Sequence, residues 1–109
     1  MLILPIKKKW FDMILSGEKK EEYREIKPYY DSRFEPYISD IGNVKIIHLE
    51  NWTGFIPVED EIVFRNGYSS NSPSIKCKVE IRKGTGKEEW GAEPNKEYYV
   101  LKILSVEKI

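Results

Sequence analysis

The sequence has only one cysteine, Cys77, and one histidine, His48. A single thiol cannot form an intramolecular disulfide, and one histidine without clustered cysteines does not provide the usual ligand set for zinc. We therefore expect no disulfide, no metal site and no cofactor. His48 lies in an apolar stretch, where a packed histidine is far commoner than a catalytic one.

Long apolar runs are also missing. No segment approaches the roughly 20 residues that a membrane-spanning helix needs. The opening MLILPIKKK is short and is interrupted by Pro5, which is unlike a signal peptide. We therefore expect a cytoplasmic chain without a membrane partner.

An excess of charge of one sign is absent as well, because eighteen basic residues balance eighteen acidic ones. This balance argues against non-specific nucleic-acid binding through overall charge, so any contact with a polyanion must come from a local patch. The 109 residues fit one domain with one core, spanning residues 1–109. The sequence carries no signal for the oligomeric state.

A helix is predicted over Lys8–Ser16, where apolar side chains repeat at spacing four, as in Trp10 and Ile14. Gly17 suits the left-handed position that follows a last helical turn. The lysines at 7–9 would stand at the positive end of this helix, where the dipole disfavours cations. Plain solvation is the usual explanation, and an anion site is the alternative.

The remaining pattern predicts mainly strands. Alternation of apolar and charged residues is clearest in SIKCKVEIRK and is typical of a half-buried antiparallel strand. We read 28–42 as irregular with a short helix near 32–37, and 51–57, 67–73 and 84–96 as loops. The predicted strands are Leu2–Ile6, Val44–Glu50, Glu61–Asn66, Ser74–Lys83 and Tyr98–Val106. The fold class is therefore α+β, mainly β, as a small mixed barrel with one main N-terminal helix.

The segment GEKKEEYREIK, residues 17–27, carries eight charges in eleven residues. On a helix, residues four apart are neighbours, and these pairs have like charges, as in Glu18 with Glu22. In a strand, alternate residues share a face, and pairs at spacing two have opposite charges, as in Glu22 with Arg24. The charge pattern therefore favours a strand, although a solvated face is the usual role of such a run.

The same segment contains Gly17-x-Lys19-x-x-Glu22-x-Arg24, which resembles the G-x-K-x-x-E-x-R signature of the ASCH family. These are small β-barrels similar to the PUA RNA-binding domain. The surrounding LPIKKKWFDMILSGEKKEEYRE, the later EIVFRNG and the closing YYVLKI also look familiar. The likeness covers nearly the whole chain, and residues 28–42 match least.

The resemblance implies a PUA-like barrel that binds RNA or a nucleotide-like small molecule in a cleft into which Lys19, Glu22 and Arg24 project. Arg24 would offer a planar fork to phosphate or base, and Glu22 would orient it. Lys19 has the opposite strand parity and would need a bulge or twist to join them. The stacking surface and rim of the cleft are assigned to Trp52, Tyr68, Ser69 and Ser70.

An enzyme is the alternative. Some ASCH-like proteins are amidohydrolases that deacetylate N4-acetylcytidine, and ribonuclease activity is attributed to others. The resemblance would make Lys19 the base or nucleophile, with Glu22 beside it. Here Glu22 stands where the amidohydrolases have threonine, and a neighbouring carboxylate raises the pKa of a lysine, which opposes that role.

Overall fold

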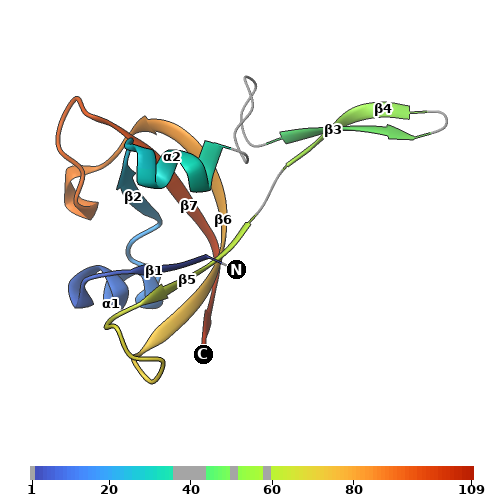
Figure 1. The fold of residues 1–109 in the computed structure, drawn as a ribbon. Helices are drawn as coiled ribbons and strands as arrows, with labels where there is room; N and C mark the ends of the chain where they lie inside the picture. Colours follow the sequence, from blue (N-terminus) through green and yellow to red (C-terminus); the bar gives the residue numbers. More distant parts are fainter. Residues whose placement is uncertain (1, 36–43, 50–51, 58–59) are drawn as a thin grey trace.

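The computed structural model describes the backbone of residues 2–35, 44–49, 52–57 and 60–109, and the side chains of residues 2–35 and 60–109. The described residues contain two α-helices and seven strands (Figure 1). A 3-10 turn covers Glu88–Trp90. The elements are β1 (Leu2–Pro5), α1 (Lys8–Ser16), β2 (Glu21–Glu25), α2 (Pro28–Phe34), β3 (Val44–Leu49), β4 (Trp52–Pro57), β5 (Asp60–Arg65), β6 (Ser74–Thr85) and β7 (Glu97–Lys108).

Five of the strands form one curled sheet in the order β1-β5-β6-β7-β2 (Figure 1). β1 pairs with β5 in parallel, and the other neighbours are antiparallel. The two longest strands, β6 and β7, cross the sheet with an irregularity between Lys78 and Val79, where a bulge increases local twist. The predicted mainly-β, α+β class with mixed pairing is confirmed, and the sheet is a half-barrel with β1 and β2 as its two edges.

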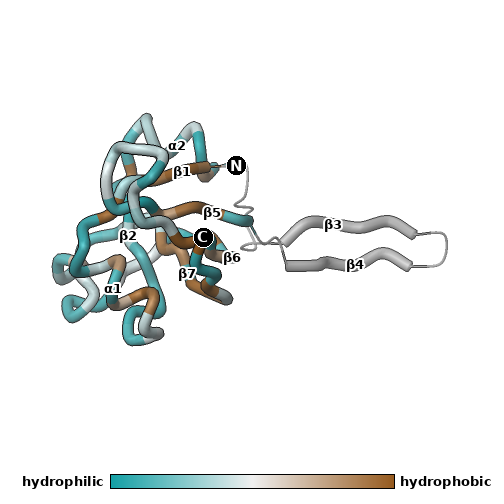
Figure 2. Tube along the Cα trace, turned by 90° about the horizontal axis from the view of Figure 1, so that it is seen from below, coloured by the Kyte–Doolittle hydropathy of each residue, from teal (hydrophilic) through white to brown (hydrophobic). Residues whose placement is uncertain are grey.

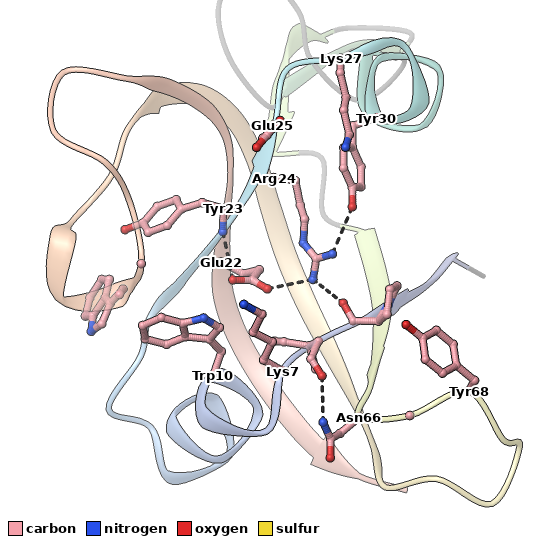
Figure 3. A pocket seen from close by; sticks show the side chains of 15 residues that line it. Lys7, Trp10, Glu22, Tyr23, Arg24, Glu25, Lys27, Tyr30, Asn66 and Tyr68 are labelled. Carbon is pink, nitrogen blue, oxygen red and sulfur yellow. Dashed lines mark hydrogen bonds and ion pairs between the residues drawn. The ribbon is translucent and has the colours of Figure 1, made fainter.

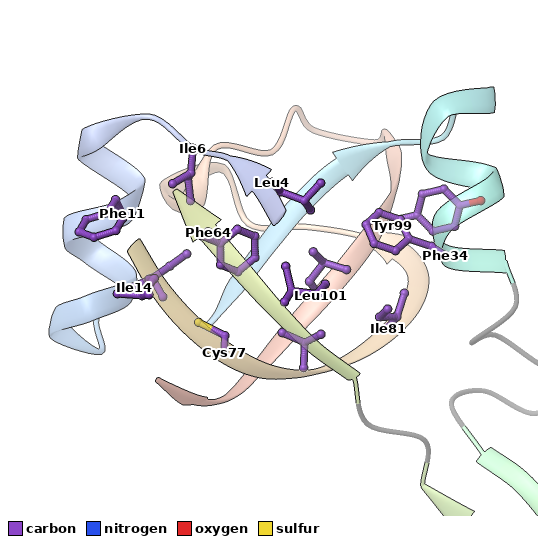
Figure 4. Packing of buried hydrophobic residues seen from close by; sticks show 13 residues of the cluster. Leu4, Ile6, Phe11, Ile14, Phe34, Phe64, Cys77, Ile81, Tyr99 and Leu101 are labelled. Atoms are coloured by element: carbon purple, nitrogen blue, oxygen red, sulfur yellow. The ribbon is translucent and has the colours of Figure 1, made fainter. Parts of the chain in front are cut away.

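The core lies on the concave side of this sheet (Figure 4). The helix α1 contributes Phe11 and Ile14, and α2 contributes Phe34. Hydrophobic stretches, brown in Figure 2, run along β1 and β5 and recur in the neighbouring strands. Burying one such aliphatic or aromatic side chain contributes about 1.5–3 kcal/mol. The helices are therefore held mainly by their apolar faces.

The alternation predicted for residues 74–83 is confirmed. Ile75, Cys77, Val79 and Ile81 are fully buried, while the residues between them are partly or fully exposed. Burial also raises the pKa of the Cys77 thiol to about 12. Cys77 therefore acts as a small hydrophobic side chain, as expected for a lone buried cysteine.

The first helix forms over the predicted residues. α1 spans Lys8–Ser16, and Gly17 follows it with a φ of 85°, in the left-handed region that glycine tolerates best. Among the residues that the structure describes, no helix is long and apolar enough to cross a membrane.

Two boundaries were predicted wrongly. A helix was expected near residues 32–37, but α2 begins at Pro28, because proline is well suited to the first helical position. The last residues of that expected range lie outside the described part. The predicted loop 51–57 is instead the strand β4, which pairs with β3 from Leu49↔Trp52 to Val44↔Pro57. Its glycine and proline suggested a loop, but proline is compatible with a strand end.

Candidate functional site

A cavity of about 590 Å³ lies where the two edges of the half-barrel approach each other (Figure 3). β1 contributes Pro5, and β2 contributes the run Glu22–Glu25. The remaining lining residues come from both helices or their approaches, the loop after β5 and the 3-10 turn: Ile6, Lys7, Trp10, Lys27, Tyr30, Asn66, Gly67, Tyr68, Trp90 and Gly91. We call this hollow the seam cavity.

Two side chains of the charged motif connect the edges of the sheet. Arg24 Nη2 donates hydrogen bonds to the Pro5 carbonyl of β1 at 2.8 Å and to Glu22 Oε2 at 2.8 Å. Glu22 Oε1 accepts the Tyr23 backbone N–H at 3.2 Å. Unpaired backbone groups on edge strands invite pairing with another chain. Glu22 and Arg24 therefore satisfy edge groups that a closed barrel would pair through its backbone.

Arg24 has further protein contacts. Its Nη1 donates to the Tyr30 hydroxyl at 3.2 Å, and its guanidinium carbon lies 5.9 Å and 5.8 Å from the ring centres of Tyr30 and Phe64. Its Nε is buried and has no hydrogen-bond partner within residues 2–35 and 60–109. Both terminal nitrogens of the predicted phosphate fork thus contact protein groups.

Lys19 lies in the turn before β2 and not in the strand itself. The alternation of strand faces, which would have placed it opposite Glu22 and Arg24, therefore does not apply to it. Its backbone N–H donates to Met13 O at 2.9 Å, which fixes the turn after α1. The Lys19 ammonium donates to the Trp90 carbonyl and lies 3.4 Å from Glu22 Oε1. The rings of Trp10 and Tyr23 stand 4.7 Å and 4.9 Å from it.

These contacts cover Lys19 completely, and its side chain has 0% exposure. Its ammonium contacts four lining residues, but Lys19 is not one of them itself. Burial lowers the pKa of Lys19, and this effect exceeds the opposing one of Glu22. The sequence expectation was correct for the direction of the Glu22 effect, and the larger effect of burial was not part of that expectation.

The motif therefore forms a triad of Lys19, Glu22 and Arg24. Glu22 contacts both cations, and its side chain is only 8% exposed. Two positive charges share one negative charge in a poorly hydrated place, so the triad carries a net positive charge. Such a charge acts over a longer range here than on an open surface, because screening by water is weaker.

The rim of the seam cavity is aromatic and basic. Trp10, Tyr30, Tyr68 and Trp90 line it, together with the exposed Lys7. Tyr68 is 98% exposed, and Figure 3 shows its ring at the edge of the hollow with the hydroxyl directed inward. The predicted aromatic at this loop is therefore beside the motif.

The loop that carries Tyr68 is held by its own hydrogen bonds. The Ser69 N–H donates to Ser72 Oγ at 3.2 Å, and the Ser72 N–H donates to Ser69 O at 3.0 Å. Gly67 has a φ of 129°, and a Cβ there would stand 2.4 Å from Ser72 Oγ. Ser69 and Ser70 are exposed in this loop but are not among the lining residues.

One predicted site residue cannot be placed, and several lining residues were missed, among them Trp10 and Tyr30. The side chain of Trp52 lies outside the described residues. Trp10 was predicted only as an apolar position of the first helix, and Tyr30 had no predicted role, although both line the cavity. The signal for Trp10 was the basic run beside it, while nothing in the sequence places Tyr30 against Arg24.

Comparison of the chain with known protein families, with curated proteins and with solved structures finds no match. The site is therefore interpreted from its own geometry. Among the described residues, no group of three or more histidine, cysteine, aspartate or glutamate side chains is placed to hold a metal ion.

Replacing Glu22 by glutamine should destabilise the fold by about 3–5 kcal/mol, because Lys19 and Arg24 would remain buried without a counter-charge. Urea unfolding measures this change. The matched control is Glu25→Gln on the same strand, since Glu25 is 58% exposed and lies 3.8 Å from Lys96. The control should lose at most about 1 kcal/mol. Equal losses in the two variants would contradict a buried, charge-coupled triad.

The depressed pKa of Lys19 predicts a pH effect on stability. Between its folded pKa and the unfolded value of 10.5, the unfolded chain binds more protons, so the stability contributed by Lys19 rises with pH. The free energy of unfolding of wild type relative to Lys19→Met should therefore increase as the pH rises toward 10.5. The comparison is made at equal pH because Tyr23, with a pKa of about 12, acts in the opposite direction. Wild type relative to Lys102→Met, at an exposed site on β7, should show no such increase.

Proposed function

We propose that this chain is an ASCH-type domain that binds RNA or a nucleotide-like ligand in the seam cavity. The volume of about 590 Å³ is in the range of small-ligand sites. The lining combines aromatic faces, on which bases stack, with cations that attract phosphate. A cytoplasmic location, expected from the sequence, is part of this proposal.

The observation that carries the proposal is the charge of the cavity floor. Lys19 and Arg24 share the single carboxylate of Glu22, so an excess positive charge lies beside the aromatic residues that line the cavity. Lys7 and Lys27 add two positive charges at the rim. Glu25 is the other acidic lining residue, and its carboxylate oxygen Oε1 lies 3.8 Å from Lys96 Nζ. A nucleotide is an anion with a flat aromatic group, so it complements both the positive charge and the aromatic lining of the cavity.

Tyr68 provides the cleanest test of stacking, because its exposed ring contributes little to the core. Replacing it by alanine should weaken binding of a single-stranded RNA oligonucleotide by about tenfold, since one base–aromatic stack contributes about 1–3 kcal/mol. Fluorescence anisotropy with labelled RNA, and competition by mononucleotides, measure the effect.

Tyr68→Phe is the control, since it retains the ring and should bind like wild type. If Tyr68→Ala binds as tightly as wild type, stacking on this ring is excluded. If wild type binds neither RNA nor mononucleotides, the proposed function is wrong.

Hydrolysis of a modified nucleoside or of RNA is the second candidate, and the lowered pKa of Lys19 favours it. A lysine base or nucleophile must lose its proton near neutral pH. The geometry favours binding instead, because Trp90, Trp10 and Tyr23 enclose the amine and separate it from the cavity.

We therefore expect no cytidine when purified protein is incubated with N4-acetylcytidine, and no cleavage of RNA. Chromatography of the nucleosides and gel analysis of labelled RNA measure the two reactions. Turnover that is lost in Lys19→Ala but retained in Lys102→Ala would establish the hydrolase in place of a binding module.

A further inference from the structure

The charged motif is already bound to protein groups. Arg24 uses Nη2 on Pro5 and Glu22 and Nη1 on Tyr30, and its Nε is buried. Glu22 accepts hydrogen bonds at both carboxylate oxygens. A ligand phosphate on Arg24 would have to replace the contact that joins β2 to β1. The geometry therefore favours a positioning role for this pair.

Two other cations line the same cavity. Lys7 precedes α1, and Lys27 precedes α2, and both side chains are exposed. Within residues 2–35 and 60–109 neither forms an ion pair, although the Lys27 ammonium lies 5.5 Å from the centre of the Tyr30 ring. Figure 3 shows them on opposite sides of Arg24, with Lys7 beside Trp10 and Lys27 beside Tyr30.

Resting on the proposed function, we propose that Lys7 and Lys27 hold the phosphate groups of the ligand, while Glu22 and Arg24 set the width of the cavity without contacting phosphate. A lysine ammonium has three rotatable donors and is strongly hydrated, which suits contact with a solvated phosphate at a rim. The two ammonium groups approach from opposite sides of Arg24, so a single strand that crosses the seam can place one phosphate near each.

Residues that contact phosphate and residues that only shape the cavity should differ in how they affect the salt dependence of RNA binding. Each phosphate contact on a single strand contributes about −0.7 to the slope of log K against log salt concentration. Loss of both lysine contacts should therefore make the slope less steep by about 1.4. A residue that acts only through the shape of the cavity should change affinity or stability and leave the slope as it is.

The experiment measures binding of a fluorescein-labelled, mixed-sequence single-stranded RNA to the full chain over a range of salt concentrations. We expect Lys7→Ala/Lys27→Ala to show the shallower slope, so that its affinity approaches that of wild type at high salt. Lys78→Ala/Lys108→Ala removes the same charge from exposed sites on β6 and β7, outside the cavity lining. This control should keep the slope of wild type.

Arg24→Lys completes the test, because it keeps the charge but loses the fork that joins Pro5, Glu22 and Tyr30. We expect a lower Tm and, below that Tm, an unchanged salt slope. If wild-type binding is strong but the double lysine variant keeps its slope, the phosphate assignment is wrong and the proposed function stands. In Arg24→Gln, which removes the charge, a slope that is shallower by about 0.7 would return the phosphate to Arg24. Absence of wild-type binding overturns both proposals.

Discussion

The contact on which the rest of this site depends is the one between Arg24 and the Pro5 carbonyl. It joins β1 and β2, the two edge strands of the five-stranded sheet, which do not pair with each other through their backbones. Glu22 holds the guanidinium in place and at the same time satisfies the Tyr23 N–H at the open edge. A charge-assisted hydrogen bond is roughly twice as strong as a neutral one, so a single pair can stabilise this approach of two edges.

The location of the seam cavity follows from this incomplete closure. Where two strands pair directly, their backbones are about 4.8 Å apart and leave no space for a ligand. Where side chains connect them, the distance is greater, and the space between becomes a hollow. The helices and the 3-10 turn then surround that hollow with Trp10, Tyr30 and Trp90. The half-barrel shape and the position of the cavity therefore both follow from the lack of backbone pairing between β1 and β2.

Several features were predictable because local patterns determine them. The spacing of Trp10 and Ile14 and the glycine at position 17 specify α1, and the alternation after Ser74 specifies β6. The opposite charges of Glu22 and Arg24 at spacing two correctly indicated an extended segment with both side chains on one face. Each of these features depends on residues close in sequence.

The unpredicted features depend on contacts between distant residues. Nothing near Lys19 indicates that the Trp90 carbonyl, 71 positions later, will cover its ammonium. The net direction of its pKa could not be predicted for this reason, since the degree of burial is a property of the folded chain. The position of β4 was missed because its strand character is expressed through pairing with β3, against the local signals of Gly54 and Pro57.

Closure by side chains also affects how the half-barrel responds to force. Elsewhere in the curled sheet, strands can separate only by breaking several backbone hydrogen bonds at once. Between β1 and β2, the separation is set by the rotamers of a few side chains, which adjust at a cost of about 1 kcal/mol. The spacing between β1 and β2 can therefore change while the backbone hydrogen bonds of the sheet stay intact.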